Sequence, residues 1–150
     1  MQLLLKARLM LRRCESHRTR SAANIEALQF KMQGLKDEIR TLDSQQQVYL
    51  MMSQQQIANG VTTRSGLFAM QQHSAVYRQK IQELALQRRE LEEQTEQLQK
   101  QLTTARSAHM QWHRKVDKFF QCVRRERIKL ALQRSWREET EVQEKYSRKF

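Results

Sequence analysis

The chain has 150 residues, no proline and a formal net charge of +12, and 29% of its residues are charged. Few aromatic residues and only three glycines argue against a deep two-layer core and favour long solvated helices. The positive charge predicts acidic partners. Two cysteines, Cys14 and Cys122, are too few for a disulfide framework and favour a reducing compartment.

The first predicted helix covers residues 2–57. Apolar residues recur in alternating steps of three and four from Leu4 to Tyr49, most cleanly between Ile25 and Leu42. Such a seven-residue repeat is typical of a coiled coil, and we call the positions in this stepping the seam. At 1.5 Å per residue the helix would be roughly 80–85 Å long.

The N-terminal end of this helix carries charged residues inside its short apolar run. This pattern fits neither a signal peptide nor a membrane-spanning helix, and the remaining sequence has no run of about 20 apolar residues. We therefore expect a cytoplasmic protein that does not insert into the membrane.

Residues 58–66 interrupt the stepping. They hold two of the three glycines among asparagine, threonine and serine, and Asn59 with Gly60 suits a left-handed helix end. The candidate N-caps for a following helix are Thr62, Thr63 and Ser65. We predict a loop here and a second helix over residues 67–148, roughly 120 Å long.

The second helix carries the longest repeat in the chain. The seam runs from Tyr77 to Leu130 without a slip, with leucine at 84, 91 and 98. A helix this long with one narrow apolar seam must lay it against another helix.

A short loop between two long helices makes them antiparallel neighbours. Folding about residue 63 pairs Leu42 with Leu84 and Leu35 with Leu91, so that seam meets seam. We predict an all-α fold in which residues 1–150 form a single domain, an antiparallel coiled-coil hairpin. The second helix would outrun the start of the first and leave a C-terminal helical overhang from Arg127 to Phe150.

Charge is unevenly spread along this predicted hairpin. Residues 1–20 hold six Lys and Arg against one Glu, and residues 112–150 hold twelve against six acidic residues. The hairpin places both segments at the same end, whereas residues 53–73 at the loop end are nearly neutral. We therefore predict one basic end that carries both termini.

Residues for catalysis are not grouped in this sequence. The three glycines are isolated, so no phosphate-binding loop is predicted, and a hairpin offers no concavity for a catalytic set. One alternative is a zinc site, against the simpler interpretation that a seam histidine sets the helix register. Its ligands would be Cys14, His17, His109 and His113. We predict no enzyme activity, no cofactor and no metal.

Three features of the basic end resemble a known family. They are the opening Leu9-Met-Leu-Arg-Arg-Cys14, the segment from Trp112 to Lys115, and Arg124-Arg125-Glu126-Arg127. With the short, proline-free, basic hairpin they resemble the stalk proteins of type III secretion systems, the YscO/SpaM/FliJ group, and most closely the SpaM (InvI) branch. The predicted overhang is longer than that of the flagellar member.

The resemblance implies a stalk similar to the central shaft of rotary ATPases. The end with both termini would enter the pore of a hexameric secretion ATPase, the loop end would face the export gate at the inner membrane, and the family also engages secretion chaperones. The residues expected to dock on the ATPase are Arg8, Arg12, Arg13, Arg124, Arg125, Arg127, Lys129 and Trp136. The residues expected to face the gate are Asn59, Gly60, Thr62, Thr63 and Arg64.

Two other functions fit the same residues. The basic end would also attract nucleic acid, although acidic residues interrupt it and no docking motif is present. A self-associating coiled coil is the second alternative, and a monomer mass of about 18 kDa in light scattering would exclude it. We expect a monomer when the protein is free, and no nucleic-acid partner.

Overall fold

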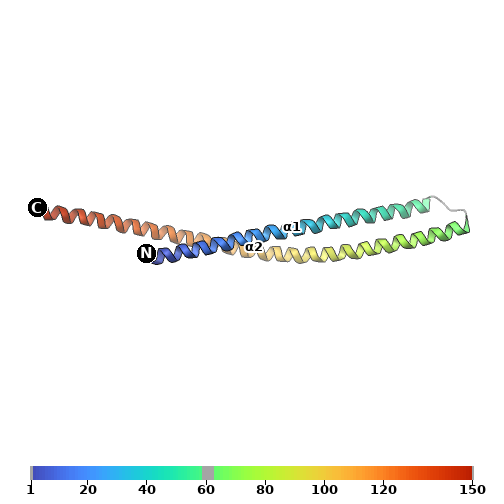
Figure 1. The fold of residues 1–150 in the computed structure, drawn as a ribbon, viewed down its shortest axis with the longest axis horizontal. Coiled ribbons are helices and arrows are strands. Elements are labelled where there is room, and N and C mark those ends of the chain that lie inside the picture. The colour runs from blue at the N-terminus through green and yellow to red at the C-terminus, as the bar shows by residue number, and fades with distance from the viewer. Residues whose placement is uncertain (1, 59–62, 150) are drawn as a thin grey trace. The chain divides into compact units, whose positions relative to one another are not determined.

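The computed structural model describes residues 2–58 and 63–149, and these residues form two long helices (Figure 1). Helix α1 spans Gln2–Ala58 and helix α2 spans Arg64–Lys149. The helices contact each other in an antiparallel hairpin, which confirms the predicted all-α class. No described helix contains a stretch apolar enough to cross a membrane.

The hairpin divides into two compact units, each built from a segment of α1 and a segment of α2. Unit 1 comprises Met1–Ile25 with Thr104–Phe150, and unit 2 comprises Glu26–Thr103. That the whole chain forms a single domain stays a prediction.

Helix α2 begins with a side-chain cap. The Gly66 backbone N–H donates to the Thr63 hydroxyl oxygen at 3.3 Å, and the Leu67 N–H donates to the Thr63 carbonyl at 3.0 Å. The hydroxyl satisfies one of the backbone donors that a helix start leaves unpaired. Thr63 is therefore the cap among the three candidates, while Thr62 lies outside the described residues.

Unit 2 has a core of aliphatic layers. Leu28, Leu84 and Leu102 are buried, and every other predicted seam position of this unit is half-buried. The Tyr49 and Tyr77 rings meet across the two helices with centroids 6.2 Å apart, as the pairing about residue 63 predicts. The stepping in threes and fours thus selects the face that each helix turns inward.

The one arginine in the α2 seam of unit 2 is paired with acidic groups. The Arg88 guanidinium lies 2.6 Å from Asp43 on α1 and 3.0 Å from Glu92 one turn along α2. The long side chain reaches out of the seam, so its charge stays partly solvated. A polar residue at such a position can fix the register of the two helices.

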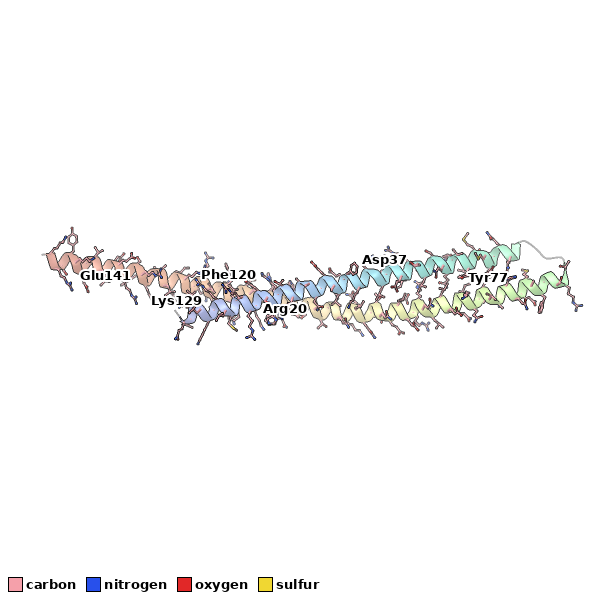
Figure 2. The ribbon with its side chains drawn as sticks, viewed as in Figure 1. Arg20, Asp37, Tyr77, Phe120, Lys129 and Glu141 are labelled. Atoms are coloured by element: carbon pink, nitrogen blue, oxygen red, sulfur yellow. The ribbon has the colours of Figure 1, made fainter. Side chains whose placement is uncertain are left out.

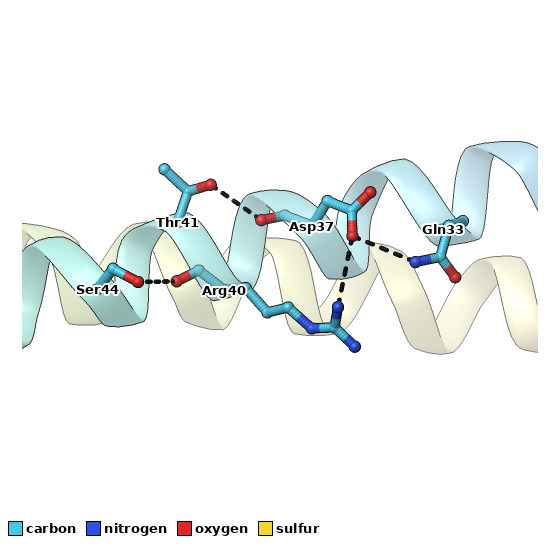
Figure 3. Close-up of polar contacts among 5 residues, drawn as sticks. All are labelled: Gln33, Asp37, Arg40, Thr41 and Ser44. Carbon is cyan, nitrogen blue, oxygen red and sulfur yellow. Dashed lines mark hydrogen bonds and ion pairs between the residues drawn. The ribbon is translucent and has the colours of Figure 1, made fainter.

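Several polar groups on the outer face of α1 in unit 2 have partners on the same helix. The Asp37 carboxylate accepts from the Gln33 amide at 3.2 Å and lies 3.9 Å from the Arg40 guanidinium (Figure 3). The Thr41 and Ser44 hydroxyls donate to backbone carbonyls one turn earlier, each at 3.0 Å. Contacts of this kind, three or four residues apart, add little stability each.

Unit 1 is packed around smaller side chains. Cys14, Ala105, Val116 and Val123 are buried, and the other seam positions from Leu4 to Ile25 and from His109 to Leu130 are half-buried. Beyond Leu130 every described residue of α2 is exposed, so the C-terminal part of the helix continues as an overhang. Glu141 in this segment is labelled in Figure 2.

Candidate protein-docking surface

The net charge of the protein belongs entirely to unit 1. This unit holds 19 Lys and Arg against seven Asp and Glu, a surplus of 12, whereas unit 2 holds nine of each and has no net charge. The two units share one fold, so the charge is not a requirement of helix packing. A surface with this surplus attracts acidic partners and steers their approach.

The predicted basic docking residues all lie in unit 1, on the outer positions of both helices. Lys129 lies 3.4 Å from Glu126, and the others form no ion pair with any described residue. All seven are exposed: Arg8, Arg12 and Arg13 on α1, and Arg124, Arg125, Arg127 and Lys129 on α2. Lys129 is labelled in Figure 2. Their charges are therefore available to a partner.

The overhang of α2 exposes a stripe of apolar side chains that includes Trp136. At 3.6 residues per turn its members fall within an arc of about 120° on the helix surface. The arc lies opposite Val123 and Leu130, the seam residues that face α1. We call this set the overhang stripe: Ile128, Leu132, Trp136, Val142 and Tyr146, which are 52%, 57%, 71%, 59% and 68% exposed.

Of the apolar residues in this segment, the sequence alone singles out only Trp136. The spacing of Ile128, Leu132 and Trp136 by four residues was a readable helical pattern. This pattern is easily missed, because it lies on another face of the helix than the seam. The seam positions after Leu130 hold only polar residues. The exposed face becomes visible once the seam face is known.

An aromatic cluster marks the other surface of unit 1 that could bind a partner. The Trp112 ring of α2 stacks on the His17 ring of α1, with centroids 4.2 Å apart and planes at 11°. The Lys115 ammonium lies 4.4 Å from the centroid of the same Trp112 ring, a cation–π contact. Trp112 and Phe119 both lie on the seam of α2 and are half-buried.

A groove of about 410 Å³ opens beside this cluster. Residues of both helices line this groove. The more buried lining side chains are mostly apolar, and the basic ones are exposed. The lining residues are Met10, Arg13, Cys14, His17, Trp112, Lys115, Lys118 and Phe119. We call it the Trp112 groove.

Two of the four residues weighed as zinc ligands contact other side chains. His17 stacks on Trp112, and the His113 imidazole lies 3.7 Å from the Asp117 carboxylate. Across residues 2–58 and 63–149, no three histidine, cysteine or acidic side chains are placed to hold a metal ion. Cys14 and Cys122 are both free thiols.

The predicted gate-facing residues are only partly described. Thr63 caps α2 and Arg64 is its first residue, and both are exposed. Asn59, Gly60 and Thr62 lie outside the described residues. Their role at the export gate stays a prediction.

Comparison with known proteins identifies the family. The model of the family described as Salmonella surface presentation of antigen gene type M protein matches residues 5–146, nearly the whole chain. No curated protein and no solved structure gives a significant match. Both halves of the hairpin lie within the matched range, and with them the basic docking residues, the overhang stripe and the Trp112 groove. The chain therefore belongs to the SpaM family of type III secretion proteins.

Proposed function

We propose that this protein is a non-enzymatic stalk of a type III secretion apparatus that docks through unit 1 on the hexameric secretion ATPase. Unit 2 and the loop end would extend toward the export gate, and secretion chaperones would be further partners. Membership of the SpaM family supports a role in secretion. The observation that carries the docking proposal is the confinement of the net charge of +12 to unit 1.

Exposed arginines and lysines suit a contact that must form and release. Each exposed charge pair contributes at most about 1 kcal/mol, and many together steer the partner without locking it. An acidic rim on the ATPase pore would complement these residues. The overhang stripe would add the apolar contact, because large exposed aromatic side chains dominate the binding energy of many interfaces.

The test of this proposal is a charge-reversal comparison between the two units. One variant carries Arg8→Glu, Arg12→Glu, Arg124→Glu and Arg125→Glu. The matched control makes the same change of net charge in unit 2, through exposed side chains without ion pairs among the described residues. The control substitutions are Lys31→Glu, Lys36→Glu, Arg78→Glu and Arg89→Glu.

Binding to the cognate secretion ATPase is measured for both variants at low and high salt. We expect the unit 1 variant to bind at least about tenfold more weakly, and the control to stay close to wild type. Wild-type binding should weaken as salt shortens the Debye length from about 30 Å at 0.01 M to about 8 Å at physiological strength. Equal binding by the two variants would show that the basic surface serves only solubility.

Trp136→Ala tests the apolar part of the same contact. It removes the large side chain that is 71% exposed in the overhang stripe, and its control is Phe30→Ala, which removes an 83% exposed ring from unit 2. ATPase binding should weaken for Trp136→Ala at both salt concentrations, since the lost contact carries no charge. Phe30→Ala should bind like wild type.

The gate-facing role is tested separately at the loop. A short Gly/Ser insertion between Gly60 and Thr63 lengthens the connection at little entropic cost, so stability should be nearly unchanged. Loss of secretion with ATPase binding intact would support a contact with the gate. Retention of both would show that the loop is only a connector.

A further inference from the structure

The Trp112 groove differs in charge from the grooves of unit 2. Arg13, Lys115 and Lys118 line it together with His17, and no aspartate or glutamate does. Three grooves among the described residues of unit 2 each include at least one glutamate, among them Glu38, Glu83 and Glu90. The Trp112 groove is thus a concave site of a single sign of charge.

The floor of the groove is apolar and partly open to solvent. Cys14 is buried beneath it, Met10 is 43% exposed, and the rings of Trp112 and Phe119 are half-buried. A volume of about 410 Å³ lies in the range of sites that enclose small ligands, and accommodates one large apolar side chain with its flanking backbone. Burying such a side chain against Met10 and Phe119 would remove apolar surface from water on both partners.

The Trp112 ring is held in place before any partner arrives. His17 stacks on it from α1, and the Lys115 ammonium lies over it from the next turn of α2. A wall fixed in this way loses little side-chain freedom on binding, which favours affinity. The same Lys115 charge lies at the edge of the groove, where it would meet an acidic group of the ligand.

We infer that the Trp112 groove binds an acidic protein segment that carries one large apolar anchor side chain. The anchor packs on Met10 and Phe119 and against the edge of the Trp112 ring, and flanking carboxylates pair with Arg13, Lys115 and Lys118. Asp117, the acidic residue between these two lysines, is not among the residues that line the groove, and its carboxylate lies 3.7 Å from the His113 imidazole. The inference rests on the proposed function, since it names what a partner of unit 1 must present.

The experiment uses the fluorescence of Trp112 in the full-length chain. The chain has two tryptophans, so Trp136→Phe leaves Trp112 as the only one. The probe is a short synthetic peptide rich in aspartate and glutamate with a central phenylalanine. Two counterpart peptides replace either the phenylalanine by serine or the acidic residues by their amides.

The acidic phenylalanine peptide should change the Trp112 emission with a saturable dependence on concentration. Each counterpart peptide should bind at least about tenfold more weakly. Lys115→Glu with Lys118→Glu should weaken the binding of the first peptide by a similar factor, and Met10→Gln by several-fold. The matched control, Arg134→Glu with Arg137→Glu, makes the same charge change on exposed positions outside the groove and should bind within about twofold of the parent.

Several outcomes would overturn the inference. They are no change of emission up to about 1 mM peptide, equal binding of the serine counterpart, or equal loss in the control variant. Tighter binding of a single-stranded oligonucleotide or of vesicles of anionic lipid than of the peptide would also overturn it, in favour of those ligands.

ATPase binding with Trp136 in place separates this inference from the proposed function. If the Lys115/Lys118 variant binds the ATPase like wild type and the peptide fails, the groove inference is wrong and the docking proposal stands. If wild-type protein does not bind the ATPase at all, the docking proposal fails whatever the peptide does.

Discussion

In unit 1 and in unit 2 the same two helices pack against each other, but they bury different side chains. Unit 2 stacks leucines under a surface without net charge, whereas unit 1 buries Cys14, Ala105 and two valines under a surplus of 12 positive charges. Self-repulsion destabilises a compact state, so unit 1 carries a cost that its packing does not require. This difference indicates that the seam residues determine the fold. The residues at the outer positions can therefore vary in charge and determine which partners bind.

The largest effect is expected from a charge in the aliphatic core of unit 2. Leu84→Asp places a carboxylate at a buried seam position and should cost several kcal/mol of unfolding free energy. The control Leu86→Asp changes a leucine that is 61% exposed on the same helix and should cost no more than about 0.5 kcal/mol. Urea unfolding followed by circular dichroism measures both, and similar midpoints would contradict the seam described here.

Enlarging a small core residue tests the tighter packing of unit 1. Ala105 is 8% exposed, so Ala105→Leu has to push the helices apart and should destabilise by about 1–3 kcal/mol. Ala131→Leu adds the same atoms at an exposed position of the overhang and should leave the melting temperature nearly unchanged. An Ala105→Leu variant as stable as wild type would mean that unit 1 is loosely packed.

The salt bridge of unit 2 should contribute less. Arg88 and Asp43 are 42% and 41% exposed, so solvent screens their attraction. A double-mutant cycle with Arg88→Gln and Asp43→Asn should give a coupling energy of about 0.2–1 kcal/mol. A coupling energy of zero would show that this ion pair does not help to set the register of the two helices.

The smallest effect concerns the response of each unit to salt. Salt screens the repulsion between the positive charges of unit 1. Unit 2 has no net charge, so salt should change its stability less. Amide hydrogen exchange should therefore slow on adding salt in unit 1, by up to about fivefold or about 1 kcal/mol, and change less in unit 2. Equal responses would show that the charges of unit 1 do not interact appreciably.

Much of the fold could be predicted from the sequence because a coiled-coil seam is periodic. The stepping in threes and fours predicted the inward face of both helices, and every seam position within the described residues is buried or half-buried. The Tyr49–Tyr77 contact followed from folding the chain about residue 63. These properties depend on residue spacing along each helix, which the sequence records directly.

The sequence also determined where the charge lies, since the basic residues sit in segments that any antiparallel pairing brings into one unit. Only the tertiary structure decided the contacts at the flanks of the seam: the stacking of His17 on Trp112, the reach of Arg88 to Asp43, and the Trp112 groove. Such contacts depend on the axial offset between the helices and on side-chain rotamers. Neither follows from a repeat that both helices share, because the repeat fixes which face turns inward but not which flanking side chains meet.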